Sequence, residues 1–540
     1  MRFYPDRKQA QEIDRYTQEN IGIPGIVLME RAAMKLAERV ASACDGLKGF
    51  DKRKDKILAV TEGGNNGGDA IAAARLLKCM GYDTYVYEIG GIAKKTESYL
   101  KQAEIAKNLS VTFIGQKDFD EELNSYSAII DGIFGVGLTR EVTGIQAGVI
   151  NAINRASAGN GCLVVACDIP SGISSDTGHV LGTAVKCDMT VTFQYIKYGC
   201  QVNEGRTYCG EIFCEDIGLY KPDTFSKMAN ALKGSGSPYL YYEYDKEEIP
   251  DHLPTRDPGS NKGSCGKVLI VAGSEEIYGA LYMCAESCFR SGAGLIRVVT
   301  HKVNRDLLMD KLPEAMVMTY DGMRYPEEEF EIGLDSAIDW ADVILAGPGL
   351  GTGGFSRYLI ERVLLRCRGG QSIVFDADAL NIISEMDTAK VFKDLRDKLG
   401  YEHVIITPHM GEMNHLLQYE YKTAELKENR AKIASEFSEA NGIITILKDD
   451  RTAIGCTGNY NTCRPVYLNT TGNDGMAKGG SGDVLAGIVA GIIAQNKDDE
   501  KTNYDLCCAA VNIHGSAGDK ARDEKGERGM LARDIISNIS

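Results

Sequence analysis

The sequence predicts an α/β protein with two domains, each a three-layer arrangement with a largely parallel β-sheet between helices. The chain has 540 residues, which is too long for a single hydrophobic core. Short apolar runs are repeatedly followed by a glycine-rich or polar loop and then by a helical pattern, as in parallel βαβ units. This periodicity is lost between residues 220 and 253. We therefore expect a first domain at 1–220, a linker at 221–245 and a second domain at 246–540.

Composition excludes several classes of protein. Apolar residues make up 44% of the chain and charged residues 25%, as in an ordinary globular protein. The net charge of −16 argues against nucleic acid or an anionic membrane as a partner, because both would be repelled. The 16 cysteines are scattered without a Cys-x-x-Cys motif, so buried reduced thiols and a cytoplasmic location are expected. The N-terminus has no apolar signal region and no run approaches 18 apolar residues.

The first domain should begin with two helices, at 8–20 and 26–43, where apolar residues recur with helical spacing. A short strand at 56–60 then leads into the glycine-rich segment Gly63–Asp69, and a helix is expected from about Ala70 to Met80. A strand, a glycine loop and a helix in this order form the layout of a phosphate-binding unit. A tight turn without a ligand would also explain the glycines.

Polar side chains follow several of the next predicted strands, which we place at 82–88, 127–131, 163–166 and 190–193. Because the carboxyl ends of parallel strands share one edge of a sheet, Asn66, Asp131, Asp168 and Ser171 should converge there. Their oxygen atoms suit a hard cation. Each of these residues by itself also occurs commonly in turns.

Three motifs in register, GGNNGGD, DGIFGVGL and DIPSG, resemble the epimerase domain of the bifunctional NAD(P)H-hydrate repair enzymes. The resemblance covers residues 1–220 and implies a Rossmann-like domain that interconverts the R and S forms of hydrated NADH and NADPH. It implies a K⁺ ion held by Asn66, Asp131 and Ser171. It also implies hydrate contacts from a set of matching positions: Asn65, Asn66, Gly67, Gly68, Asp69, Gly135, Val136, Gly137, Leu138, Thr139, Arg140, Glu141 and Asp168.

Two residues of this first domain are candidates for catalysis. A carboxylate placed beside the hydrate can transfer protons, so Asp168 is the expected acid/base residue. Lys197 follows the predicted strand at 190–193 and is a second candidate. A solvated surface lysine would explain Lys197 equally well.

The second domain repeats the pattern of a β run followed by a polar or glycine-rich loop. A helix at 279–291 connects the first two of its strands, which predicts a parallel sheet with right-handed crossovers. The predicted strands share short length and high apolar content, and they lie at 268–272, 295–300, 341–345, 373–375, 404–406 and 443–447.

The loops of this domain carry the groups needed for phosphoryl transfer, which are positioned charges and phosphate-sized glycine turns. Asp376, His409 and Lys448 each follow a predicted strand. In the stretch Gly472–Gly487, Asp483 opens an apolar helix after a glycine turn, where free N–H groups favour an anion. Turn residues, a loop histidine, a lysine extending to solvent and an N-cap aspartate are the simpler explanations.

The motifs AGPGLG, FDADALN, TPHMGEM and GNDGMAKGGSGDVLAG resemble the ADP/ATP-dependent NAD(P)H-hydrate dehydratase domain, a ribokinase-like domain. The resemblance covers about residues 240–540. It implies hydrate contacts from Ala280, Gly351, His409 and Asp483. It implies nucleotide contacts from a further set of residues: Lys448, Asp449, Asp450, Arg451, Thr452 and Gly482.

This sequence departs from the family pattern at two places. The segment Lys448-Asp449-Asp450 stands where the family often has Lys-Gly. Lys478 stands before a glycine pair, where the family usually has a small residue. Both departures leave open whether ADP or ATP is preferred, although the bifunctional arrangement resembles the bacterial enzymes and so implies ADP.

The expected mechanism is a two-step repair. Hydrated NADH carries an extra hydroxyl at C6 of the nicotinamide ring, and the first domain would equilibrate its two epimers. In the second domain Asp483 would deprotonate that hydroxyl, which would attack the terminal phosphoryl group of ADP or ATP with Mg²⁺ present. Phosphate would then leave by elimination, and AMP would be the other product from ADP. We also expect a homo-oligomer.

Two other functions fit parts of the sequence. A small-molecule kinase for a vitamin precursor or sugar, with an appended nucleotide-binding domain, would share the Gly-Ser-Gly-Asp turn but would make a stable phosphorylated product. A nucleotide sensor without activity would fit better if the acids were missing, but Asp168, Asp376 and Asp483 are all present.

Overall fold

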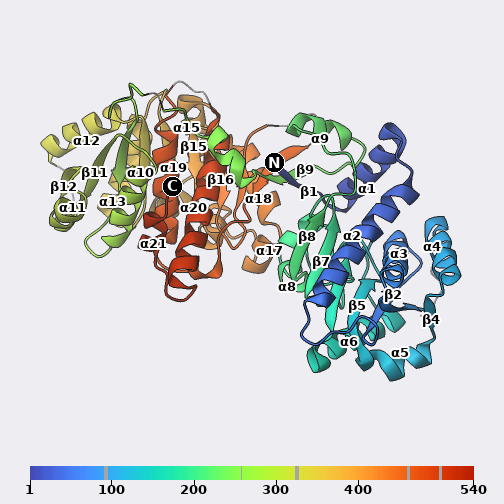
Figure 1. The fold of residues 1–540 in the computed structure, drawn as a ribbon. Helices are drawn as coiled ribbons and strands as arrows, with labels where there is room; N and C mark the ends of the chain where they lie inside the picture. The colour runs from blue at the N-terminus through green and yellow to red at the C-terminus, as the bar shows by residue number, and fades with distance from the viewer. Residues whose placement is uncertain (91–94, 257, 323–326, 459–462, 498–500) are drawn as a thin grey trace. The chain divides into compact units, whose positions relative to one another are not determined.

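The computed structural model describes residues 1–540 except 91–94, 257, 323–326, 459–462 and 498–500 (Figure 1). The chain divides into two compact units. We call Phe3–Leu240 the N-terminal unit. The C-terminal unit comprises Met1–Arg2, Tyr241–Asn459 and Arg464–Ser540.

The segment expected to be a linker contains regular structure. Within 221–245 lie the helix α9 (Phe225–Ala231) and the strand β9 (Tyr239–Glu243). The helix begins at an N-cap, Thr224, whose hydroxyl accepts from the Lys227 amide. Both elements are too short to show a clear period in the sequence. The expected domain boundaries stay a prediction.

The N-terminal unit is built on a seven-stranded sheet in the order β4-β3-β2-β5-β6-β7-β8, with every neighbouring pair parallel. The strand order reverses between β2 and β5, because the chain leaves β2 for β3 and β4 and then returns to β5. Such a switch point is where α/β sheets bind ligands. The strands are β2 (Lys56–Thr61), β3 (Asp83–Glu88), β4 (Thr112–Ile114), β5 (Tyr126–Gly132), β6 (Leu163–Cys167), β7 (Met189–Phe193) and β8 (Glu211–Glu215).

Helices cover both faces of this sheet, and a buried apolar cluster lies on each face. One cluster joins α2 and α3 to the sheet, and the other joins α6 to it. The helical elements of the unit are α1 (Arg7–Tyr16), η1 (Thr17–Ile21), α2 (Gly25–Asp45), α3 (Asn65–Cys79), α4 (Glu97–Asn108), α5 (Gln116–Glu122), η2 (Leu123–Ser125), α6 (Gly144–Asn160), α7 (Tyr198–Gln201) and α8 (Gly205–Tyr208). The three-layer fold expected for the first domain is confirmed.

Helix α3 begins at Asn65, five residues before the position expected from the sequence. Gly67 and Gly68 therefore lie in the helix and not in a loop. A Cβ at Gly67 would come within 2.0 Å of the Glu62 carbonyl oxygen, and one at Gly68 within 2.8 Å of the Met29 methyl group. These glycines serve close packing of α3 against its neighbours, which a reading based on loop composition alone misses.

The other sheet has eleven strands in the order β1-β9-β18-β17-β16-β15-β14-β13-β10-β11-β12. Its central part, from β12 to β16, is parallel, and β17 and β18 continue antiparallel. The order reverses between β10 and β13. The remaining strands are β1 (Arg2–Tyr4), β10 (Lys267–Val271), β11 (Leu295–His301), β12 (Met316–Tyr320), β13 (Val343–Ala346), β14 (Ser372–Phe375), β15 (Val404–Ile406), β16 (Ile444–Leu447), β17 (Ala453–Gly455) and β18 (Arg464–Leu468).

Helix α19 (Ser481–Ile493) is buried along nearly its whole length and packs against α10 (Gly279–Arg290) and α20 (Asn503–Lys525). A Cβ at Gly487 would come within 2.1 Å of the Ser287 hydroxyl, so glycine is needed for the close approach of α10. The other helices are η3 (Lys246–His252), η4 (Lys302–Asn304), α11 (Arg305–Lys311), α12 (Glu328–Trp340), α13 (Gly354–Arg366), α14 (Asp378–Ser384), α15 (Thr388–Leu399), α16 (Met410–Leu416), α17 (Thr423–Glu428), α18 (Arg430–Asn441), η5 (Asp474–Met476) and α21 (Ala532–Ser537).

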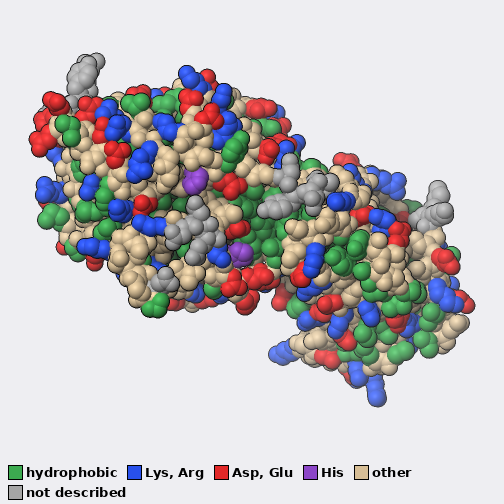
Figure 2. Space-filling model, turned by 90° about the horizontal axis from the view of Figure 1, so that it is seen from above, with side chains coloured by type: hydrophobic (Ala, Val, Ile, Leu, Met, Phe, Trp, Pro, Cys, Tyr) green, Lys and Arg blue, Asp and Glu red, His purple; other side chains and the backbone are tan. Residues whose placement is uncertain are grey.

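The distribution of charged side chains and the state of the cysteines agree with what the composition predicts. Acidic and basic side chains are intermixed over the face shown in Figure 2. All sixteen cysteines are free thiols, and most are buried. Among the described residues, no helix is both long and apolar enough to cross a membrane.

Candidate active sites

The N-terminal unit contains a cavity of about 640 Å³. The segments that follow β2, β5, β6 and β7 line it, together with α1 and α2. It therefore lies at the carboxyl ends of the strands, beside the β2–β5 switch point. Its volume is in the range of small-molecule sites.

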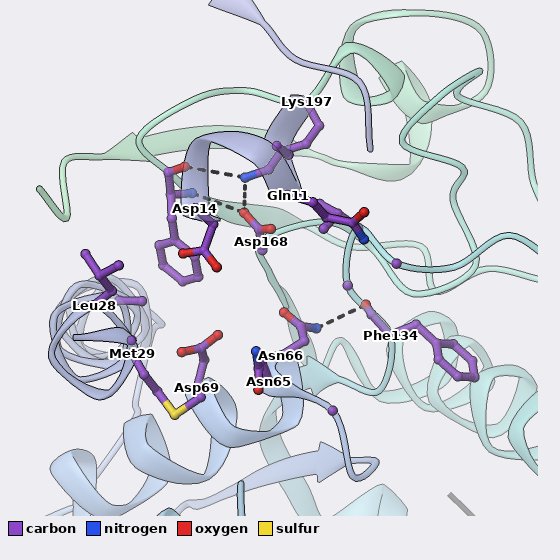
Figure 3. Close-up of a pocket in the computed structure, with 18 of the residues that line it drawn as sticks. Gln11, Asp14, Leu28, Met29, Asn65, Asn66, Asp69, Phe134, Asp168 and Lys197 are labelled. Atoms are coloured by element: carbon purple, nitrogen blue, oxygen red, sulfur yellow. Dashed lines mark hydrogen bonds and ion pairs between the residues drawn. The ribbon is translucent and has the colours of Figure 1, made fainter. Parts of the chain in front are cut away.

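Asp168 and Lys197 form an ion pair at this cavity (Figure 3). The Lys197 ammonium donates to Oδ1 of Asp168, which also accepts from the Phe193 amide at 3.2 Å and the Thr192 hydroxyl at 3.1 Å. Asp168 has φ +68°, a conformation that few non-glycine residues adopt. Lys197 is only 4% exposed, so it is not a solvated surface lysine. The pair joins the two catalytic candidates of this unit.

Two further carboxyl groups face the same space, from Asp69 on α3 and Asp14 on α1 (Figure 3). Burial raises the pKa of Asp69 well above its ordinary value, the charges of Asp168 and Asp14 raise it further, and Lys197 opposes them. Burial also raises the pKa of Asp14, against a hydrogen bond from Gln18 and together with the charge of Asp168. Sequence reasoning missed Asp14, because no motif surrounds it.

Asn66, Asp131 and Ser171 are brought together by a hydrogen-bond network around the backbone of Phe134. The Ser171 hydroxyl donates to Oδ1 of Asp131 at 2.5 Å, and the Ser171 amide donates to Oδ2 at 2.7 Å. The Asn66 amide group donates to the Phe134 carbonyl at 3.0 Å, and the Phe134 amide donates to Ser171 at 2.8 Å. Burial raises the pKa of Asp131 to about 6, although the hydrogen bonds from Ser171 and Ile133 lower it.

Most of the residues expected to contact the hydrate line the cavity, namely Asn65, Asn66, Asp69, Gly135, Val136, Gly137, Leu138, Thr139, Arg140 and Asp168. Gly67, Gly68 and Glu141 lie outside this lining. The first two are buried in the packing of α3. Their contacts with a hydrate stay a prediction.

In the C-terminal unit, Asp483 lies in the first turn of α19, where the first backbone N–H groups have no carbonyl partner within the helix. The helix begins after Gly480, which has φ +97°. A Cβ there would come within 2.4 Å of the Met283 side chain, so the turn requires glycine. Burial raises the pKa of Asp483 to about 7, and the charge of Asp376 adds to this effect while Lys448 opposes it.

Lys448 pairs with Asp376 rather than with Asp483. Its ammonium donates to Oδ1 of Asp376 at 2.6 Å, and the Thr407 hydroxyl donates to the same oxygen at 2.7 Å. The pKa of Lys448 is raised: burial alone lowers it, but the charges of Asp376 and Glu412 outweigh burial. A Cβ at Gly482 would lie 3.3 Å from the Lys448 nitrogen, which places this cation beside the start of α19.

His409 caps helix α16 from the neighbouring strand end. Its Nδ1 accepts from the amides of Gly411 and Glu412, so the ring proton is on Nε2, 3.2 Å from Oε1 of Glu412. Glu412 in turn accepts from the His409 amide at 2.8 Å. Burial raises the pKa of Glu412 and Asp376 adds to this, against the charge of Lys448 and the hydrogen bond from the His409 amide. Glu412 was not among the predicted site residues, although it lies within TPHMGEM.

Gly351 and Ala280 are close to the same strand ends. The Gly351 amide donates to Oδ2 of Asp378 at 2.8 Å. A Cβ at Gly349 would come within 3.0 Å of Ala280, which brings the start of α10 against the glycine loop after β13. A buried histidine on α20, His514, lies 3.4 Å from the Ser481 hydroxyl, and burial lowers its pKa to about 4.

In the nucleotide-binding segment predicted at 448–452, the charged side chains have partners on different elements. Lys448 faces Asp376, but the carboxylates of Asp449 and Asp450 pair with Arg430 on α18. The Thr452 carbonyl accepts from the Asn469 amide at 2.9 Å. Nucleotide contacts from Asp449, Asp450, Arg451 and Thr452 stay a prediction, and the two carboxylates already have a cationic partner.

Lys478, the other departure from the family pattern, ties the glycine-rich loop to the segment before α21. Its ammonium donates to the carbonyls of Arg528, at 2.7 Å, and Met530. The extra length of lysine relative to a small residue is thus used for a tether within the unit.

The fold, with one group of polar side chains around Asp168 and another around Asp483, is that of an α/β enzyme with two domains. A family model described as NAD(P)H-hydrate dehydratase matches residues 268–540, and one described as YjeF-related protein N-terminus matches residues 25–199. A bifunctional NAD(P)H-hydrate repair enzyme of Moorella thermoacetica is 31% identical over 97% of this chain and 93% of its own length. The Escherichia coli enzyme of the same description is 29% identical over 98% and 92%. The chain therefore belongs to the family of bifunctional NAD(P)H-hydrate repair enzymes.

Among solved structures, an ADP/ATP-dependent NAD(P)H-hydrate dehydratase from Bacillus subtilis, co-crystallised with ATP/Mg²⁺, is similar to part of the chain. It is 27% identical and covers 56% of this chain and 96% of its own, with a TM-score of 0.45.

Proposed function

We propose that the two units divide the repair of hydrated NADH and NADPH between them, with the residues described above in defined roles. The chain is a bifunctional NAD(P)H-hydrate repair enzyme, combining epimerisation of the hydrates with nucleotide-dependent dehydration of the S form. The N-terminal unit would carry out the epimerisation and the C-terminal unit the dehydration.

In the N-terminal unit, Asp168 acts as the acid/base residue and Lys197 holds it in position. The ion pair and two hydrogen bonds occupy one carboxylate oxygen, which orients the group at the cavity wall. The glycine-rich loop 135–139 and the start of α3 enclose the hydrate. The position of the cavity at the β2–β5 switch point supports this assignment.

The network of Asn66, Asp131 and Ser171 fits a K⁺ ion. Its donors are oxygens of an amide, a hydroxyl and a single carboxylate, with the Phe134 carbonyl beside them, and oxygen donors of this kind suit a hard cation. In the described part of the chain, no group of three or more His, Cys, Asp or Glu residues forms a metal site. A bound K⁺ would fix the loop after β5 against α3.

In the C-terminal unit, Asp483 takes the proton of the C6 hydroxyl as that oxygen attacks the terminal phosphoryl group of the nucleotide. AMP leaves if the donor is ADP. The phosphate at C6 then leaves with its bonding electrons, and loss of a proton from C5 restores the ring double bond. Mg²⁺ would be held mainly by the nucleotide phosphates, where it supplies positive charge. Lys448 and the N-terminus of α19 add positive charge from the protein.

One observation carries this assignment: Asp483 stands at a helix N-terminus with a pKa of about 7. A carboxylate with that pKa is a better base at neutral pH than an ordinary one. The positive end of the helix beside it is suited to the phosphoryl group.

The deciding experiment mixes purified protein, Mg²⁺, ADP or ATP and a mixture of R and S hydrates of NADH, and follows both phosphate and restored NADH. We expect full conversion of both epimers with about one phosphate per NADH. Conversion that stops at the S fraction would remove the epimerase assignment. A stable phosphorylated product without NADH would favour the kinase alternative.

The proposal also includes a cellular location, a preferred nucleotide and an oligomeric state. A cytoplasmic location is supported by the sixteen free thiols, which suit a reducing compartment. ADP as the preferred donor is tested by running the assay with each nucleotide. A homo-oligomer is tested by light scattering of the purified protein.

A further inference from the structure

One of the carboxyl groups that face the cavity of the N-terminal unit comes from a helix outside all the family motifs. Asp14 lies on α1 and lines the cavity, and Figure 3 shows its carboxyl group pointing into the same space as Asp69 and Asp168. One turn later, in the π-helical segment η1, Gln18 donates to Oδ2 of Asp14 at 2.8 Å. The side-chain amide thus anchors one oxygen of Asp14.

Asp14 and Asp168 stand in unequal electrostatic environments. Asp168 is paired with the Lys197 ammonium, whereas among the described residues Asp14 has only the neutral Gln18 amide as a hydrogen-bond partner. The other charged residues that line the cavity are Glu62, Asp69, Arg140, Asp168 and Lys197, and the charge of Asp168 acts on Asp14. Burial and the charge of Asp168 raise the pKa of Asp14, so it holds its proton more firmly than an ordinary aspartate. Two carboxyl groups in different surroundings supply an acid and a base.

Epimerisation of the hydrate needs one group of each kind. At C6 the hydroxyl and the ring nitrogen N1 are bonded to the same carbon. A base takes the hydroxyl proton, the C6–N1 bond breaks with its electron pair going to N1, and C6 becomes an aldehyde carbon while an acid gives N1 a proton. After rotation about C5–C6, N1 attacks the other face of the aldehyde and both protons return. Atoms and electrons balance without an added reactant.

We propose that Asp14 is a catalytic residue of the epimerase site, the acid that protonates N1 while Asp168 takes the proton of the C6 hydroxyl. This inference rests on the proposed function of the N-terminal unit. It adds a second proton-transfer group to the one that the motif DIPSG contains. Gln18 is then a positioning residue, because it acts through Asp14.

The test uses the full-length protein, the pure R hydrate and no nucleotide, and follows formation of the S hydrate above the uncatalysed rate. We expect Asp14→Asn to lower kcat by about 10²–10³-fold, in the range of general acid catalysis, with little change in KM. Asp14→Glu should recover part of the rate. The matched control is Glu19→Gln, an exposed position on η1, which should keep the wild-type rate.

The pH profile separates catalysis from a structural role. The alkaline limb of kcat/KM, where the acid loses its proton, should disappear in Asp14→Asn. Gln18→Leu keeps the carboxyl group but removes a hydrogen bond that lowers its pKa, so the alkaline limb should move to higher pH. The Gln18→Leu variant also keeps the test decisive if Asp14→Asn folds poorly. Dehydration of the S hydrate, measured on the same preparation, reports whether the C-terminal unit is active.

Several outcomes would overturn the inference. Wild-type kcat in Asp14→Asn would show that Asp14 transfers no proton. Rapid entry of ¹⁸O from labelled water into C6 of the S hydrate would indicate loss and return of water instead of ring opening. If the wild-type protein itself leaves the R hydrate unchanged, the proposed function fails first, and the role of Asp14 fails with it.

Discussion

The two units each place an aspartate–lysine pair at the carboxyl ends of parallel strands, but they use it differently. In the N-terminal unit, Lys197 pairs with Asp168, the proposed acid/base residue itself. In the C-terminal unit, Lys448 pairs with Asp376, and the proposed base, Asp483, stands apart at the start of α19. The lysine therefore binds the proposed catalytic carboxylate directly in the N-terminal unit. In the C-terminal unit the lysine binds a different aspartate near the proposed catalytic one.

The surroundings of each proposed catalytic aspartate affect how readily it accepts a proton. In the part of the chain that the structure describes, no lysine donates a hydrogen bond to Asp483, and burial together with the nearby Asp376 charge raises its pKa to about 7. Asp168, by contrast, receives a hydrogen bond from the Lys197 ammonium. Dehydration should thus depend on a base that titrates near neutral pH.

The largest effect is expected from Asp483→Asn. Loss of the base should reduce phosphate release by about 10²–10⁴-fold, the range for a general base, and leave epimerisation intact. The side chain keeps its shape, so the comparison isolates the proton-accepting oxygen. Phosphate release and R-to-S conversion are measured on the same preparation. Normal phosphate release would show that another group takes the proton.

The mirror experiment is Asp168→Asn, which should lower epimerisation by about 10²–10⁴-fold and leave dehydration of the S hydrate unchanged. Asp168→Ala should in addition leave the buried Lys197 without its partner, at a cost of about 3–5 kcal/mol in stability. Thermal unfolding separates the two effects. Asp216→Asn, an exposed position, is the control. Loss of both activities in Asp168→Asn would contradict separate sites.

The pH dependence sharpens the comparison. As the pH falls below about 7, Asp483 becomes protonated and can no longer act as a base, so kcat/KM of dehydration should fall. Well below that value the fall approaches roughly tenfold per pH unit, as for a single titrating group. Epimerisation should not follow the same curve. A flat dehydration profile between pH 5 and 8 would rule out this role for Asp483.

A smaller effect is expected from the proposed K⁺ site. Removing K⁺ should weaken hydrate binding to the N-terminal unit and leave the dehydratase KM unchanged. Because the pKa of Asp131 is about 6, lowering the pH from 7 to 5 should protonate it and weaken K⁺ binding. We expect the affinity for K⁺ to fall about tenfold when Asp131 loses its charge, because a tenfold change corresponds to the interaction energy of one pKa unit. Titration of epimerase activity with KCl at both pH values measures this shift, and equal K⁺ affinity at both would contradict it.

The smallest effect concerns Lys478. Lys478→Met removes two hydrogen bonds from an ammonium to carbonyls, so the glycine-rich loop should be held less firmly. We expect a rise of about three- to tenfold in the nucleotide KM with kcat nearly unchanged, since one charged hydrogen bond contributes about 1.5–3 kcal/mol and the loop keeps its other contacts. The exposed Lys520→Met is the control. A lower kcat at unchanged KM would instead place Lys478 in the chemical step.

Sequence alone predicted two three-layer α/β units and the edge of each parallel sheet at which the candidate site residues meet. It did so because hydrophobic periodicity marks parallel strands, and the carboxyl ends of such strands meet at one edge. Asn66, Asp131 and Ser171 are close together for that reason. The start of α3 at Asn65 was not predicted, because the glycines that suggest a loop are needed for packing of the helix.

Tertiary structure alone decided which charges pair and which stay unpaired. Asp14 reaches the cavity of the N-terminal unit from a helix with no motif. The choice of Asp376 over Asp483 as the partner of Lys448 follows from how β14, β16 and α19 pack. Burial and neighbouring charges set the pKa of each carboxyl group, and both depend on segments far apart in the chain. A local pattern of residues contains the chemical groups, but their protonation is a property of the folded environment.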